Sequence, residues 1–192
     1  MYPSWLAEIG VEDQKISRWC RNNNVTYRVV KSLNSPETVK FVRDSKIDTL
    51  IYGGGGILRD ELIEAASDHV INPHSGPLPE IRGMNAIEWA LLLDEALEVT
   101  VHFIDRGIDT GDIIRRVPVK LFPQIQLEEL RETAVITAVM EISKLLSEAG
   151  DTQSIPRVKQ PLTSAGRQCF IMAPAIVAKT RNKLEQLLQS VH

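Results

Sequence analysis

Segments with helical periodicity alternate with segments rich in β-branched residues along this chain, and this alternation restricts the folds that it can adopt. The helical patterns cover residues 11–21, 36–45, 58–66, 86–93, 127–149 and 175–189, and the β-rich runs cover residues 25–31, 47–52, 69–71, 99–104 and 113–121. Strands separated by helices are joined by crossover connections, which place them parallel in one sheet. We therefore predict an α/β fold: an open, mostly parallel, Rossmann-like sheet with helices on both faces.

The length of 192 residues is that of one compact domain rather than two domains with separate cores. We predict that residues 1–150 form the α/β domain that carries the site, and that residues 151–192 form a C-terminal appendage ending in a helix. The appendage has six Lys or Arg residues against two acidic ones, a local charge of +4, which leaves −7 on residues 1–150. Residues 151–192 are therefore basic, and they are too few to hold a core of their own.

Charge and cysteine content exclude several classes of protein. A net charge of −3 gives no general electrostatic reason to bind nucleic acid or an anionic membrane. Cys20 and Cys169 lie far apart and form no CxxC pair, so neither a disulfide framework nor a zinc site is indicated. No apolar run has the length of a membrane span, and the first residues lack the pattern of a signal peptide. We expect a cytoplasmic protein with no membrane partner.

In an open α/β sheet, ligands bind beyond the carboxyl ends of the strands, so the loops that follow predicted strands are the most informative. The first such loop, residues 53–58, begins with four glycines, which allow a backbone to approach a ligand closely. It is not a phosphate loop, because no Gly-Lys-Ser/Thr follows and Leu58 occupies the last position of a GxGxxG pattern. A binding loop and a flexible turn both remain open as interpretations.

The second loop contains Asn72, Pro73 and His74. Proline biases the residue before it toward an extended conformation, and residues two apart in an extended chain point the same way. We therefore expect the Asn72 amide and the His74 imidazole to face one pocket, where a hydrogen-bond donor and an acid–base group could reach the same carbonyl group. Ordinary turn chemistry is the alternative.

The third loop, residues 105–112, contains three aspartates. An EF-hand would need glycine at its sixth position, where Thr110 stands, and a closing Glu that is absent, so we expect no metal. A carboxylate from this loop near His74 would orient the imidazole ring and raise its pKa. An acidic turn that caps neighbouring backbone explains Asp105 and Asp112 equally well.

Two stretches of the chain, taken together, carry a more specific pattern. Residues 71–83 read INPHSGPLPEIRG, and residues 99–114 read VTVHFIDRGIDTGDII. The two stretches contain, in this order, Asn-x-His, Leu-Pro, Arg-Gly, Val-Thr-x-His and Asp-Thr-Gly. This pattern resembles that of the formyltransferase family that uses 10-formyltetrahydrofolate. The resemblance covers residues 14–121, with a looser similarity at Gln160 and over residues 167–174. It implies a sheet of the formyltransferase type and a formyltransferase-like catalytic domain over residues 1–150.

The resemblance implies roles for particular residues. Asn72, His74 and Asp109 correspond to the catalytic Asn, His and Asp of the family. The segments that match the folate pocket are Gly55, Gly56, Ile57 and Leu58, together with Asp105, Gly107, Ile108, Thr110 and Gly111. When an amine attacks the formyl carbon, negative charge develops on the formyl oxygen, which the Asn72 amide and a protonated His74 would stabilise. Asp109 would keep His74 charged and aligned.

Family members begin with two further βα units, so the resemblance implies an N-terminally shortened chain. We expect it to self-associate through an exposed sheet edge near residues 47–52 or 25–30, giving a homo-oligomer. The short start argues against the purine-pathway acceptor, and the few residues after Gly150 argue against methionyl-tRNA. The expected reaction is formyl transfer from 10-formyltetrahydrofolate to a small primary amine such as an amino sugar. Hydrolysis of 10-formyltetrahydrofolate and a non-catalytic folate-binding or interaction module remain as alternatives.

Overall fold

In the computed structural model, the structure describes residues 15–67, 69–150, 155–161 and 166–190. The chain divides into two compact units, residues 1–32 and residues 33–192. The described part of the first unit contains the helix α2 (Ile16–Asn22), which confirms the second half of the helix predicted over residues 11–21; residues 11–14 lie outside the described residues.

The strand predicted over residues 25–31 is wrong. These residues have no regular secondary structure, and Val25, Tyr27 and Val29 are exposed. Valine and tyrosine favour a strand only where a neighbouring strand accepts the backbone hydrogen bonds and the side chains pack on a shared face. None of the described residues pairs with this segment as a strand.

The second unit is built around a four-stranded sheet. Its strands are β1 (Leu50–Ile51), β2 (Val70–His74), β4 (Glu98–Phe103) and β5 (Ile113–Pro118), in the spatial order β1-β2-β4-β5. The strands β1 and β2 pair in parallel, whereas β4 is antiparallel to both β2 and β5. The sheet is therefore open and mixed, and β4 and β5 are neighbours because only the loop 104–112 separates them.

A second, two-stranded sheet joins parts of the chain that are far apart in sequence. The strands β3 (Ile81–Gly83) and β6 (Arg167–Cys169) pair in parallel. The two backbones approach so closely that a Cβ at Gly83 would lie 2.2 Å from the carbonyl oxygen of Cys169. Three-residue strands are too short to show an alternating pattern, and the sequence therefore did not predict them.

The helices of the second unit begin and end close to the predicted residues. They are α3 (Pro36–Ser45), α4 (Asp60–Ala65), α5 (Ala86–Leu92), α6 (Leu127–Glu148) and α7 (Pro174–Ser190). The side chain of Ser35 accepts a hydrogen bond from the Thr38 backbone N–H, and Pro36 occupies the first turn, so α3 starts where the sequence predicts. Glu129 of α6 accepts a hydrogen bond from the Gln126 backbone N–H.

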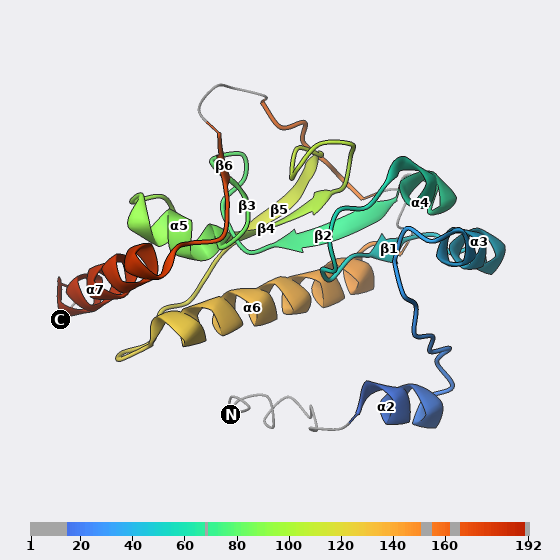
Figure 1. The fold of residues 1–192 in the computed structure, drawn as a ribbon, viewed down its shortest axis with the longest axis horizontal. Coiled ribbons are helices and arrows are strands. Elements are labelled where there is room, and N and C mark those ends of the chain that lie inside the picture. The colour runs from blue at the N-terminus through green and yellow to red at the C-terminus, as the bar shows by residue number, and fades with distance from the viewer. Residues whose placement is uncertain (1–14, 68, 151–154, 162–165, 191–192) are drawn as a thin grey trace. The chain divides into compact units, whose positions relative to one another are not determined.

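Helices cover both faces of the four-stranded sheet, which confirms the predicted α/β class. Ile71, Val101 and Phe103 pack against α6, which runs along one side of the sheet (Figure 1). Val70 points to the opposite face and packs against residues of α3 and α4. On β4, Thr100 and His102 alternate with the valines and so lie on the face away from α6. That face carries the candidate site.

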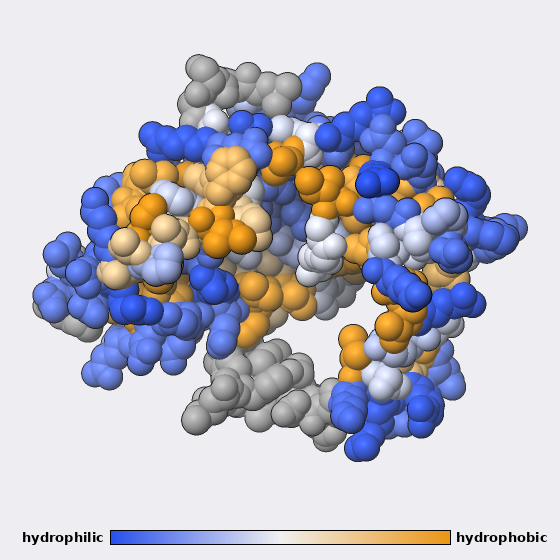
Figure 2. Space-filling view, viewed as in Figure 1, coloured by the Kyte–Doolittle hydropathy of each residue, from blue (hydrophilic) through white to orange (hydrophobic). Residues whose placement is uncertain are grey.

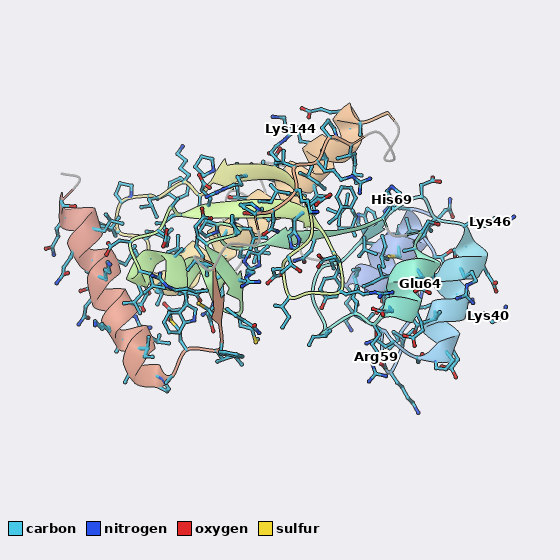
Figure 3. All side chains as sticks on the ribbon, turned by 90° about the horizontal axis from the view of Figure 1, so that it is seen from above. Lys40, Lys46, Arg59, Glu64, His69 and Lys144 are labelled. Carbon is cyan, nitrogen blue, oxygen red and sulfur yellow. The ribbon has the colours of Figure 1, made fainter. Side chains whose placement is uncertain are left out.

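The described residues after 150 contact the rest of the second unit at several places. Val158 forms an antiparallel bridge with Ile113, β6 pairs with β3, and Leu184 of α7 lies in the same buried cluster as Leu91 and Leu130. The visible surface is hydrophilic around α3 and has hydrophobic areas elsewhere (Figure 2). The labelled side chains Lys40, Lys46, Arg59 and Glu64 point outward around α3 and α4, and Lys144 does so on α6 (Figure 3). Within the described residues, no helix has both the length and the apolar character needed to cross a membrane.

Candidate active site

The strand β2 presents Asn72 and His74 on the face of the sheet away from α6. In the register with β4, Asn72 lies opposite His102 and His74 lies opposite Thr100. The Asn72 amide Nδ2 is 3.0 Å from Nε2 of His102. A bulge follows on the neighbouring pair, where Val101 pairs with Arg115 but His102 pairs with Ile113. Such bulges re-aim side chains next to functional sites. The two residues predicted to share a pocket therefore do face the same side.

The loop between β4 and β5 brings Asp109 to these histidines. One carboxylate oxygen of Asp109 lies 3.5 Å from Nδ1 of His74, and the other lies 3.6 Å from Nε2 of His102. The Gly83 backbone N–H donates a hydrogen bond of 2.8 Å to the same carboxylate. The structure thus brings Asn72, His74 and Asp109 together, as the resemblance implies.

His102 belongs to the same cluster, although the sequence reasoning gave it no role. Its ring is edge-on to that of His74, with 6.2 Å between the ring centroids, and the side chain is buried. The signal was present in the Val-Thr-x-His pattern, because a histidine that alternates with buried valines must lie on the opposite face of the strand. The sequence alone does not show which residue faces it.

Each histidine has one ring nitrogen held by a backbone carbonyl group. His74 Nε2 lies 2.8 Å from the Ile81 carbonyl oxygen, and His102 Nδ1 lies 2.7 Å from the Phe103 carbonyl oxygen. A carbonyl oxygen only accepts, so these nitrogens carry the hydrogen. In each neutral ring, the remaining nitrogen is unprotonated and faces Asp109. Nε2 of His102 there accepts from the Asn72 amide, so Nδ1 of His74 is the position left to accept a proton.

Burial and charge act in opposite directions on this cluster. Burial alone would raise the pKa of Asp109, but the contact with His102, the facing His74 and the Gly83 N–H lower it to about 2. Burial lowers the pKa of His74 below its ordinary value; Asp109 and the Ile81 carbonyl group oppose this effect, and His102 adds to it. Asp109 raises the pKa of His74, as expected, but burial outweighs the carboxylate, so the expectation of a charged His74 is wrong. At neutral pH, Asp109 is ionised and His74 is neutral.

The loop that carries Asp109 is shaped by its own side chains. The Asp105 carboxylate accepts hydrogen bonds from the Gly107 N–H (2.9 Å) and the Thr110 hydroxyl (2.6 Å), which is the turn-forming role considered for Asp105. A Cβ at Gly107 would lie 1.9 Å from the Thr110 Oγ1, and one at Gly111 would lie 1.9 Å from the Phe103 carbonyl oxygen. Both glycines are thus required by close packing, and Ile108 is exposed beside them.

The glycine loop after β1 presents backbone to the surroundings. Gly54, Gly55 and Gly56 all have φ above +100°, and a Cβ at Gly54 or Gly56 would meet nothing within 4 Å. The Tyr52 hydroxyl donates to the Gly56 carbonyl oxygen. Burial raises the pKa of Tyr52, and the charge of Asp109 adds to the rise, so the phenol and the carboxylate interact electrostatically.

The two residues that end this loop differ in their surroundings. Ile57 is exposed, whereas the side chain of Leu58 packs among α3 and α4, so Leu58 can offer only its backbone to a ligand. The Asn34 amide fixes this end of the loop, because it donates to the Ile57 carbonyl oxygen and accepts from the Arg59 N–H. In the described part of the chain, no group of three or more His, Cys, Asp or Glu side chains could hold a metal ion.

The known proteins that this chain matches are formyltransferases. A family model described as "Formyl transferase" matches residues 11–140. Methionyl-tRNA formyltransferase from Acetivibrio thermocellus is 24% identical over 148 residues, which are 76% of this chain and 47% of that protein. The protein of the same name from Solibacter usitatus is 34% identical over 119 residues, 60% of this chain and 38% of that protein. The chain spans about half the length, or less, of these curated relatives.

Solved structures show the same fold. The formyltransferase PseJ from Anoxybacillus kamchatkensis, in complex with UDP-4,6-dideoxy-4-formamido-L-AltNAc and tetrahydrofolate, has a TM-score of 0.58 and 26% identity, covering 79% of this chain and 80% of that one. Phosphoribosylglycinamide formyltransferase from Streptococcus pneumoniae has a TM-score of 0.59 and 20% identity, covering 71% of this chain and 81% of that one. With the family match extending over most of the chain, this protein is a member of the formyl transferase family.

Proposed function

We propose that the protein transfers a formyl group from 10-formyltetrahydrofolate to a primary amine of a small substrate. The observation that carries this proposal is the cluster of Asn72, His74, His102 and Asp109 on one face of the sheet. It combines an amide donor, a neutral imidazole and a carboxylate that stays ionised. Formyl transfer to an amine requires these three capacities: stabilising charge on an oxygen, accepting a proton, and stabilising the cation that results.

His74 supplies the proton acceptor. Its Nε2–H is held by the Ile81 carbonyl group, so Nδ1 is the position that takes the proton lost by the attacking amine. The imidazolium that forms has Asp109 3.5 Å away, and the carboxylate stabilises it. His74 thus begins the cycle neutral, becomes charged as the new C–N bond forms, and returns the proton to the departing nitrogen when the old C–N bond breaks. The ionised Asp109 stays a carboxylate throughout.

Asn72 supplies the donor for the developing negative charge. One N–H of its amide bonds to Nε2 of His102, and in the described part of the chain the other makes no hydrogen bond. That second N–H is the group proposed to bind the formyl oxygen, and it is held in place because His102 fixes the plane of the amide. His102 is therefore a positioning residue in this proposal.

The glycine loop fits the donor, which supplies an activated formyl group when bound. A flat heterocycle with edge hydrogen-bond groups requires exposed backbone without side chains in the way. Gly54 and Gly56 offer such backbone, with open space where a Cβ would stand. We propose that the donor binds against two segments: Gly55, Gly56, Ile57 and Leu58, and Asp105, Gly107, Ile108, Thr110 and Gly111.

For the acceptor, we propose an amino sugar linked to a nucleotide. PseJ supports this choice, because at 26% identity it matches about four-fifths of both chains and was solved with a formamido sugar nucleotide. The curated relatives act on methionyl-tRNA by name, so the proposal has a direct competitor. A panel assay separates them: nucleotide-linked amino sugars, glycinamide ribonucleotide and methionyl-tRNA are each incubated with the donor and the purified chain.

The readout of the panel is the mass of each acceptor after the reaction. We expect a gain of one formyl group on an amino sugar and none on the other two, with the reaction lost in His74→Ala. Formylation of methionyl-tRNA or glycinamide ribonucleotide in preference to every amino sugar would overturn the assignment of the acceptor. Release of formate without any formylated amine would overturn transfer itself.

A further inference from the structure

Gln160 is a buried polar residue that the mechanism above does not use. It lies in the described segment 155–161, and its side chain is only 4% exposed. Its Nε2 donates to the carbonyl oxygen of Asp109 (3.1 Å) and to that of Gly111 (2.6 Å). A primary amide has two N–H groups, so both are used by the loop that carries the catalytic carboxylate.

The backbone that Gln160 holds is in an uncommon conformation. Asp109 has φ = 52°, in the left-handed region that residues with a side chain adopt at a cost of about 1 kcal/mol or more. Such a conformation persists only where the surroundings fix it. Within the loop, the Asp105 carboxylate binds the Gly107 N–H and the Thr110 hydroxyl, on either side of Asp109, but not Asp109 itself. Among the described residues, Gln160 is the one whose side chain binds the Asp109 carbonyl oxygen.

The position of Gln160 is in turn fixed from outside the loop. Val158, two residues earlier, exchanges both backbone hydrogen bonds with Ile113, at 2.7 and 2.8 Å. Ile113 begins β5, at the point where the loop returns to the sheet. The amide is therefore attached to the rigid end of the sheet, and its two bonds transmit that rigidity to Asp109. The bond to Gly111 is buried and the bond to Asp109 is partly buried, which makes their loss costly.

We infer that Gln160 is a positioning residue of the active site, whose carboxamide sets the backbone of Asp109 so that the carboxylate lies between His74 and His102. Without it, the loop relaxes and the carboxylate leaves His74. The inference rests on the proposed function only for its kinetic consequence. The placement of the carboxylate against His74 can be measured in a protein without any activity.

The test is a double-mutant cycle of Gln160→Met with Asp109→Asn in the full chain. Methionine has nearly the volume of glutamine and no donor, so it removes both bonds without a cavity. The measurements are the pKa of His74 by NMR titration, with its signal identified by its loss in His74→Ala, and kcat for formyl transfer. Gln189→Met, an exposed glutamine on α7, is the matched control. If Gln160→Met does not fold, Gln160→Asn replaces it. Asparagine keeps the carboxamide but carries it on a side chain one methylene shorter.

We expect Gln160→Met to lower the pKa of His74 as Asp109→Asn does, and to lower kcat about 10²-fold, the cost of misplacing a catalytic group by about 1 Å. In the Asp109→Asn background, the same substitution should change neither quantity further. A lower melting temperature with an unchanged pKa of His74 and an unchanged kcat would overturn the inference. Equal losses of kcat in the wild-type and Asp109→Asn backgrounds would also overturn it. A lowered pKa of His74 in a protein that transfers no formyl group would support the positioning role and contradict the proposed function.

Discussion

Replacing Asp109 by Asn is the change that examines the site most closely. The amide keeps the shape of the carboxylate but removes the charge that lies 3.5 Å from His74 and 3.6 Å from His102. It also puts an N–H where one of two acceptor oxygens stood. The Gly83 N–H, which donates 2.8 Å to the carboxylate, loses a charged partner. The substitution thus isolates the electrostatic contribution of one buried anion.

The magnitude follows from the pKa of the carboxyl group. The folded protein lowers the pKa of Asp109 from 3.8 to about 2. At about 1.4 kcal/mol for each pKa unit, the surroundings favour the charged form by about 2 kcal/mol. Because the folded-state pKa lies below the unfolded one, this stability is fully present above about pH 4 and is lost as the pH falls toward 2. Asp109→Asn should lower the free energy of unfolding by about 2 kcal/mol at neutral pH. The stability of the variant should also lack this dependence on pH between about 4 and 2.

The effect on catalysis acts through His74. Asp109 supports the pKa of His74 against burial, so its removal lowers that pKa further and weakens the imidazole as a proton acceptor. We expect kcat to fall by about 10²- to 10⁴-fold, the usual contribution of a general base. Urea unfolding at several pH values, NMR titration of His74 and steady-state kinetics measure the three effects. An unchanged or raised pKa of His74 together with near-normal kcat would refute this account of Asp109.

Three further changes test other parts of the structure. His74→Ala should lower kcat by at least about 10²-fold and leave the dissociation constant for the folate donor within a few-fold, as measured by calorimetry; more than half of the wild-type kcat would remove His74 from the mechanism. Gly111→Ala places a Cβ 1.9 Å from the Phe103 carbonyl oxygen and should cost about 1–3 kcal/mol of unfolding free energy, whereas Gly53→Ala, with nothing within 4 Å, should cost little. We expect the chain to self-associate through the edge strand β1, in which case Ile51→Lys reduces the association seen by light scattering; unchanged association would exclude that edge.

The sequence was informative where local patterns decide the structure. The alternation of residues on β2 placed Asn72 and His74 on one face, and the register of β2 with β4 shows them there. The Ser35 cap and Pro36 located the start of α3. The strand predicted at residues 25–31 is wrong although these residues have a high β propensity, because strand formation depends on a neighbouring strand that the sequence does not specify.

The rest of the site depends on contacts between distant residues. The sequence cannot show that Gln160 binds the Asp109 backbone, or that β6 pairs with β3 and so fixes Gly83 beside the carboxylate. The pKa of His74 depends on the balance between burial and one anion, and only the three-dimensional structure shows that burial is larger. Residue types therefore identified the groups, whereas the fold determined their protonation.

Isotope tracing shows whether this cluster transfers a formyl group to an amine. The purified chain is incubated with 10-formyltetrahydrofolate labelled with ¹³C in the formyl group and with nucleotide-linked amino sugars, and the products are analysed by mass spectrometry and NMR. We expect a ¹³C-formamide on an acceptor amine, formed by the wild-type protein and at least about 10²-fold more slowly by His74→Ala. Labelled formate as the sole product, or an equal yield of formamide from both proteins, would contradict it.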